Sequence, residues 1–122
     1  MVAIPTLYER LGGEGAIQAV VDGMYAKIFP DPELSDFFRK TDHAHQKAMQ
    51  VNFLTFATGG STEYHGKSMI DVHKGRGITD ADFDRVCGHV ISTMQDLNVT
   101  QELINETAGL ILPLRGACTD SE

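Results

Sequence analysis

The stretch Met69-Ile-Asp-Val-His-Lys-Gly-Arg-Gly77 places one histidine, His73, in a short segment that ends in glycines. Upstream of it, Gln46 and Gln50 occupy an otherwise apolar helix face that they share with Phe53 and Leu54. A glutamine on a buried face must find a hydrogen-bond partner or cost about 1–3 kcal/mol. One potential metal ligand and two amides on a buried face therefore indicate a pocket built around a bound group.

The composition is that of an ordinary globular chain. With 122 residues, we expect one domain covering residues 1–122. A hydrophobic fraction of 42% is enough for a normal core, although a large apolar cofactor could add much burial to so small a domain. A net charge of −7 argues against nucleic acid or an anionic membrane surface as a partner.

Cysteine usage and the absence of targeting signals predict a cytoplasmic protein. Cys87 and Cys118 are the two cysteines, too few for a disulfide framework and not spaced as a metal-binding Cys-x-x-Cys. The N-terminal residues lack a basic region followed by an apolar run, the pattern of a secretory signal. No apolar stretch approaches the roughly 18 residues of a membrane span, so we expect no membrane association.

Hydrophobic spacing is helical nearly throughout and predicts an all-α fold. Several polar residues are placed to begin helices: Asp31 before Pro32, Asp42, Thr79 with a capping box to Asp82, and Thr100. Pro113 lacks the amide hydrogen that would continue the last helix, so a kink or break is expected there.

An ordered set of motifs resembles the truncated haemoglobins, specifically their first group. The resemblance runs from about Thr6 to Cys118 and rests on several elements in order: Gly12-Gly13, Tyr25, Phe37-Phe38, Gln46-x-x-x-Gln50, Gly59-Gly60 and His73-Lys-Gly-Arg-Gly-Ile-Thr79. It implies a truncated globin fold, a two-over-two α-helical sandwich around haem. It also implies one haem b per chain, with His73 as the proximal iron ligand.

The same resemblance assigns two further kinds of contact to the cofactor. Phe38 matches the aromatic residue that packs on the porphyrin face near the distal side. The basic and tyrosine side chains at the expected haem edge could meet the propionates: Lys47, Tyr64, Lys67 and Arg76. Core residues expected to touch the porphyrin are Met69, Val72, Ile78, Phe83 and Val86.

Tyr25, Gln46 and Gln50 match the family's distal polar positions. We expect the Tyr25 hydroxyl to be the principal donor to bound oxygen, with the two amides orienting it or donating directly. Slow oxygen release should follow, which suits chemistry on a bound gas better than transport. The family most often suggests dioxygenation of nitric oxide to nitrate. No G-x-G-x-x-G motif is present for a nicotinamide or flavin, so a separate reductase is implied.

Some positions depart from the family pattern. Certain cyanobacterial relatives place an iron-binding histidine where this chain has Met49, so a Met49-ligated resting state is conceivable, although gap-filling is the simpler interpretation. Other relatives attach haem covalently through a histidine on the last helix, but no histidine follows His89 here. His43 and His45 are interpreted as solvated residues of a helix's first turn, and His89 as structural.

Two other classes of function remain open. A protein that binds or senses oxygen, nitric oxide or carbon monoxide without turnover would share the same pocket. The same open iron could also support nitrite reduction or peroxidase-like activity. The second of these classes is a helical interaction module without haem, but such a module has no need for two glutamines that face a pocket.

Overall fold

The computed structural model describes residues 5–39, 41–61 and 78–114. These residues form helices and contain no β-strand, and among them no helix is long and apolar enough to cross a membrane. The elements are α1 (Leu7–Leu11), α2 (Glu14–Ile28), the 3-10 helix η1 (Ser35–Phe38), α3 (His43–Ala57), α5 (Asp80–Asp96), α6 (Gln101–Ile111) and the 3-10 helix η2 (Leu112–Leu114).

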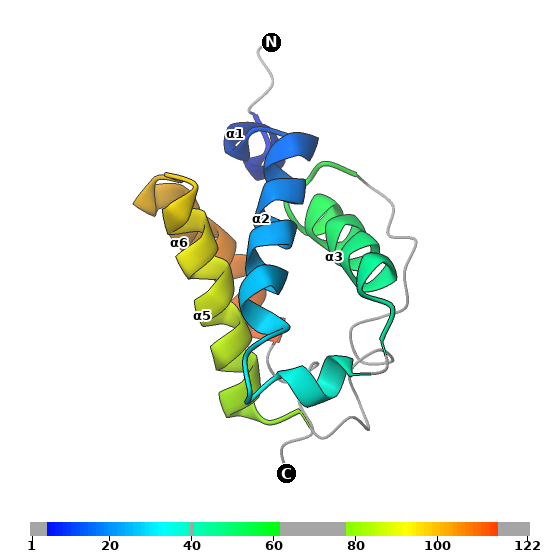
Figure 1. Cartoon of the computed structure of the whole chain (residues 1–122). Coiled ribbons are helices and arrows are strands. Elements are labelled where there is room, and N and C mark those ends of the chain that lie inside the picture. The colour runs from blue at the N-terminus through cyan, green and yellow to red at the C-terminus, as the bar shows by residue number, and fades with distance from the viewer. Residues whose placement is uncertain (1–4, 40, 62–77, 115–122) are drawn as a thin grey trace.

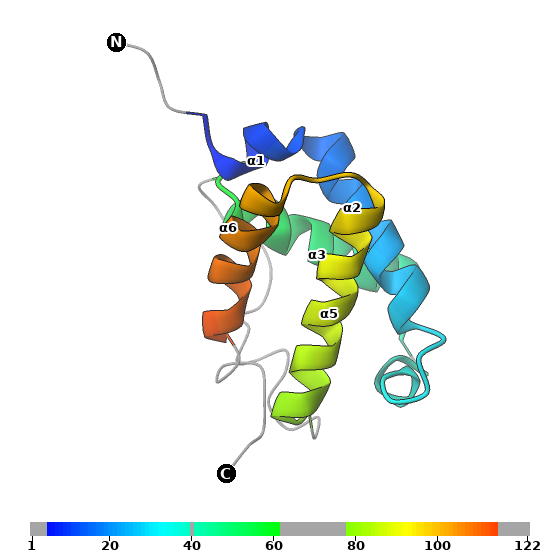
Figure 2. The ribbon, with the colours of Figure 1, turned by 90° about the vertical axis from the view of Figure 1, so that its left-hand side faces the viewer.

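Helix α2 is the central element, with α5 along one side and α3 on the other (Figure 1). Helices α5 and α6 run antiparallel and are joined by a short turn (Figure 2). The core is built around the apolar stripe of α2, whose buried members recur at spacings of three and four: Ile17, Val20, Val21, Met24, Tyr25 and Ile28. A helix buried on this stripe can hold a side chain such as Tyr25 between its two neighbours.

The contact between α2 and α5 depends on a glycine. A Cβ atom added at Gly23 would overlap the Cγ2 atom of Thr93, so the two helices approach at a point where no larger side chain fits. Thr93 is itself buried, and its Oγ1 has no hydrogen-bond partner within the described part of the chain. The close approach is therefore a packing requirement rather than a polar one.

The helix ends follow the local signals in the sequence. The Asp42 side chain accepts hydrogen bonds from the first turn of α3, and Thr79 and Asp82 form the predicted capping box of α5. Thr100 caps α6, which ends at Ile111 before a 3-10 turn that contains Pro113. These predictions are confirmed.

Glycines with positive φ make two sharp turns. Gly12 and Gly13, with φ of 120° and 77°, turn the chain from α1 into α2, and Gly59, with φ of 92°, follows α3. A backbone hydrogen bond from Tyr8 N to Thr58 O, 2.9 Å long, then ties α1 to the end of α3. The Gly12-Gly13 pair thus makes the short connection from α1 to α2, and the turn at Gly59 follows a chain end held against α1.

The segment after α2 differs from the expected short helix beginning at Asp31-Pro32. The 3-10 helix begins only at Ser35, and Asp31 instead caps a turn through a 3.0 Å hydrogen bond from Glu33 N. The other carboxylate oxygen of Asp31 is held by side chains from α5. This tertiary contact fixes the residue in a turn, which sequence spacing alone did not show.

Candidate functional site

A cavity lies between α2, η1, α3 and α5, next to the end of α6 and η2. Its empty volume of about 1020 Å³ includes the solvent-open space at its mouth. Most of its lining is apolar, from residues that include Met24, Ile28, Phe53, Leu54 and Val90. A mostly apolar lining of this kind suits an apolar ligand.

Three polar side chains gather at this cavity. Tyr25 comes from α2, and Gln46 and Gln50 come from adjacent turns of the same face of α3. The Tyr25 side chain is buried, with only 3% of the residue exposed, and Gln46 and Gln50 are half-buried. The structure therefore brings together all three residues that the sequence analysis grouped as a polar set.

One hydrogen bond joins two members of this polar set. Gln46 Nε2 donates to Tyr25 Oη over 3.1 Å. Because the hydroxyl oxygen accepts this bond, its own proton remains available to donate to a ligand in the cavity. Burial raises the pKa of the Tyr25 phenol above its usual value, and the bond from Gln46 offsets only part of that rise. The hydroxyl is thus protonated at neutral pH, as a donor must be.

Aromatic rings hold the Tyr25 ring from two sides. The Phe29 ring stacks on it with centroids 4.8 Å apart, and the Phe38 ring meets it edge-on at 5.9 Å. Phe29 and Phe38 also meet each other edge-on at 5.4 Å. Phe29 was not predicted from the sequence, because the apolar stripe of α2 was traced only to Ile28. Its position four residues after Tyr25, on the same helix face, was the available signal.

The remaining residues predicted to contact a cofactor divide into three groups. Phe38, Ile78, Phe83 and Val86 all line the cavity. Lys47 lies on α3 with its Nζ 3.5 Å from Asp22 Oδ1 and is not among the lining residues. The others lie outside the described residues: Tyr64, Lys67, Met69, Val72, His73 and Arg76.

Several lining residues were not assigned to a site from the sequence. Asp82 and Leu114 border the cavity, and so do Cys87 and Ile111, which were interpreted only as core residues. Cys87 is buried, as a small apolar side chain would be. Met49 is half-buried and does not line the cavity in the part of the chain that the structure describes.

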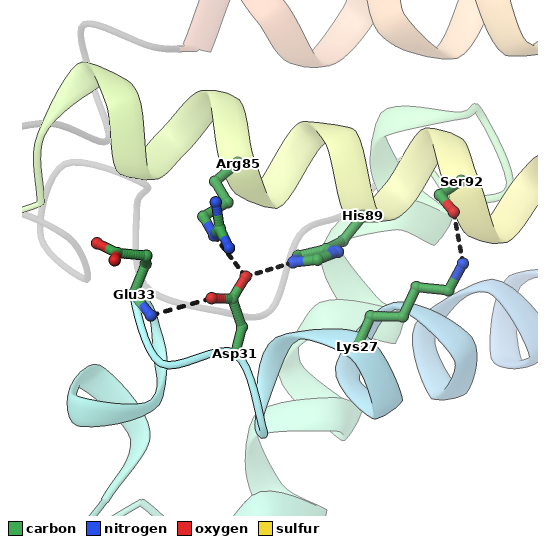
Figure 3. A network of polar contacts seen from close by, with 6 residues as sticks. All are labelled: Lys27, Asp31, Glu33, Arg85, His89 and Ser92. Atoms are coloured by element: carbon green, nitrogen blue, oxygen red, sulfur yellow. Dashed lines mark hydrogen bonds and ion pairs between the residues drawn. The ribbon is translucent and has the colours of Figure 1, made fainter.

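A second polar cluster ties the segment that follows α2 to α5 (Figure 3). Asp31 Oδ2 accepts from Arg85 Nε at 2.5 Å and lies 2.7 Å from His89 Nε2, and only 4% of its side chain is exposed. The hydrogen bond from Arg85, followed by that with His89, holds the pKa of this carboxyl well below its usual value. The cluster is structural, as expected for His89.

The helical architecture with this cavity is that of a globin, as comparisons with known proteins show. The family model described as "Bacterial-like globin" matches residues 6–120. The chain belongs to the bacterial-like globin family.

Its relatives within that family are group 1 truncated haemoglobins. One from Tetrahymena pyriformis is 41% identical, over 87% of this chain and 88% of its own. The crystal structure of truncated haemoglobin from the same organism, in its Fe(III) form, superposes with a TM-score of 0.90 at 38% identity, covering 96% of this chain and all of that one.

The 2/2 haemoglobin of Synechococcus sp. PCC 7002, solved in the cyanomet state with covalently attached haem, gives a TM-score of 0.91 at 35% identity. The match covers 96% of this chain and 100% of the Synechococcus chain. The resemblance to group 1 truncated haemoglobins and the all-α truncated globin fold are therefore confirmed.

Proposed function

We propose that this protein holds one haem b per chain in the cavity, with His73 as the proximal iron ligand, and binds oxygen, nitric oxide and carbon monoxide at the haem iron. The observation that carries the proposal is the Gln46–Tyr25 hydrogen bond at the edge of a large apolar cavity. Family membership supports the cofactor, and the Synechococcus relative was solved with covalently attached haem.

The residues present fit such a group. The cavity is mostly apolar, as a porphyrin requires, and Phe38, Phe83 and Val86 are among its lining residues. No histidine follows His89, so we do not expect a covalent attachment of haem through the last helix. Lys47, Tyr64, Lys67 and Arg76 are the side chains from which contacts to the propionates would come, and Met69, Val72 and Ile78 would add apolar contacts.

When bound, haem supplies an iron that binds a diatomic gas reversibly and changes its oxidation state. The chain supplies the donor to that gas. Tyr25 keeps its proton because burial raises its pKa, and Gln46 holds the hydroxyl oxygen. Gln50, one turn further along α3, adds a second amide at the same cavity. A donor fixed in an apolar site strengthens binding of a partly charged gas, so oxygen should leave slowly.

Slow release favours a reaction of the held oxygen. One oxygen molecule, one nitric oxide and one electron give one nitrate ion, so the dioxygenation balances only with an external electron source. This implies a separate reductase as a partner. We also propose a cytoplasmic location, as the reduced-thiol composition suggests. Rapid mixing of the oxygenated protein with nitric oxide tests the reaction. Stoichiometric nitrate at a near-diffusional rate supports dioxygenation, whereas slow oxidation supports a gas-binding or sensing protein without turnover.

A further inference from the structure

Three rings form a stacked column that runs from the surface of the protein to the cavity. The imidazole of His43 lies on the Phe29 ring with centroids 3.7 Å apart and planes 14° apart. Phe29 in turn stacks on Tyr25 at 4.8 Å and 20°. His43 is exposed and Tyr25 is buried, so the column connects a surface histidine to the phenol that borders the cavity.

His43 also contacts a third element. Its Nε2 lies 3.4 Å from the carbonyl oxygen of Phe38, the last residue of η1. His43 itself is the first residue of α3, and Phe29 is the C-cap that directly follows α2. One side chain thus touches the end of α2 and the end of η1 while it begins α3.

The position of this contact matters for the polar set. Gln46 lies three residues after His43, about one helical turn further along α3. Its Nε2 must reach Tyr25 Oη, which belongs to α2. A hydrogen bond weakens steeply as its distance and angle depart from the preferred range, so a small shift of the start of α3 relative to α2 would weaken this bond.

We propose that His43 is a positioning residue for the Tyr25–Gln46 pair, acting through its stack on Phe29. It touches no ligand itself; it fixes the start of α3 against the end of α2, so that the amide meets the hydroxyl. This inference rests on the proposed function, because the pair matters only if it holds a bound gas. His45 provides a comparison, since it is exposed in the same first turn of α3 but its ring stacks on no described residue.

The test compares oxygen dissociation from the ferrous, haem-loaded protein across matched variants. His43→Ala removes one ring of the stack and Phe29→Leu removes the other. Each should accelerate oxygen release several-fold, and His45→Ala should not. His43→Phe keeps a flat ring on Phe29 and should return the rate close to that of the parent. In a Tyr25→Phe background, His43→Ala should not accelerate oxygen release further, because His43 acts on release only through the Tyr25 hydroxyl.

A second readout does not depend on gas release. In the diamagnetic carbon monoxide form, the side-chain amide signals of Gln46 in ¹⁵N-labelled protein report its hydrogen bond. They should shift in His43→Ala and stay unchanged in His45→Ala.

Unchanged amide signals and an unchanged release rate in His43→Ala would overturn the role of His43, while acceleration by Tyr25→Phe would leave the proposed function standing. If Tyr25→Phe itself has no effect, the proposed donor is wrong, and the amide signals still decide whether His43 positions Gln46.

Discussion

Gln46 Nε2 donates a hydrogen bond to Tyr25 Oη across 3.1 Å, joining α3 to α2 at the edge of the cavity. The direction of this bond has a chemical consequence. A hydroxyl that accepts from an amide keeps its own proton for another acceptor, and burial keeps that proton in place at neutral pH. Tyr25 is thereby prepared to donate to a ligand before the ligand arrives.

Replacing Tyr25 by phenylalanine should remove that donor while keeping the ring stacked on Phe29. A hydrogen bond to a charged acceptor is worth about 1.5–3 kcal/mol, so the oxygen dissociation rate should rise by roughly one to two orders of magnitude. Stopped-flow replacement of oxygen by carbon monoxide measures it. Tyr8→Phe, at a half-buried tyrosine outside the cavity lining, is the matched control and should leave the rate unchanged.

Gln46→Leu should have a smaller effect than Tyr25→Phe, because the hydroxyl remains but loses the amide that orients it. We expect oxygen release a few-fold faster than in the parent. The two substitutions should not add, since residues in one hydrogen-bonded network are coupled. The double variant should release oxygen about as fast as Tyr25→Phe alone, and fully additive effects would show that Gln46 acts independently of Tyr25.

Gly23→Ala should destabilise the fold by about 1–3 kcal/mol, the usual cost of overpacking. The added Cβ would overlap Thr93 Cγ2 at the contact between α2 and α5. Thr93→Ser removes that methyl group and should restore much of the lost stability in the double variant. Gly88→Ala on α5 is the control, because its Cβ would meet nothing within 4 Å. It should stabilise by about 0.5–1 kcal/mol in a chemical denaturation series.

Asp31 should make stability depend on pH on the acid side. Its folded-state pKa is lowered by Arg85 and then by His89, so its stabilising contribution is complete above the ordinary carboxyl pKa of about 4 and is lost as the pH falls below it. Asp31→Asn should lower the free energy of unfolding at neutral pH and flatten its decline in acid. Asp36→Asn, at an exposed carboxylate paired with the equally exposed Arg39, should keep the parent's acid profile.

Local signals in the sequence predicted much of the fold. Capping by Asp42, Thr79 and Thr100 depends on neighbouring residues alone, and so does the helix break at Pro113. The turn at Asp31 was not predicted, because its partners on α5 are more than fifty residues away in the sequence. Spacing along one helix cannot show which distant side chain a carboxylate will meet.

Part of the candidate site could likewise be predicted from the sequence. Helical spacing placed Gln46 and Gln50 on one face, and the resemblance to a known family joined them to Tyr25; the structure brings the three together at one cavity. The stack of His43 on Phe29 was not predicted, because His43 is exposed, as expected of a first-turn residue, and its contact crosses between helices. The role of His73 remains a prediction, since it lies outside the described residues.

The most direct test of the account is the absorption spectrum of the purified protein in its ferric, reduced, and reduced and oxygenated forms, recorded beside His73→Ala. We predict a Soret band that shifts when oxygen binds the reduced protein and is lost or altered in the variant. A colourless protein that does not take up added haem, or a spectrum that His73→Ala leaves unchanged, would contradict a histidine-ligated haem in this cavity.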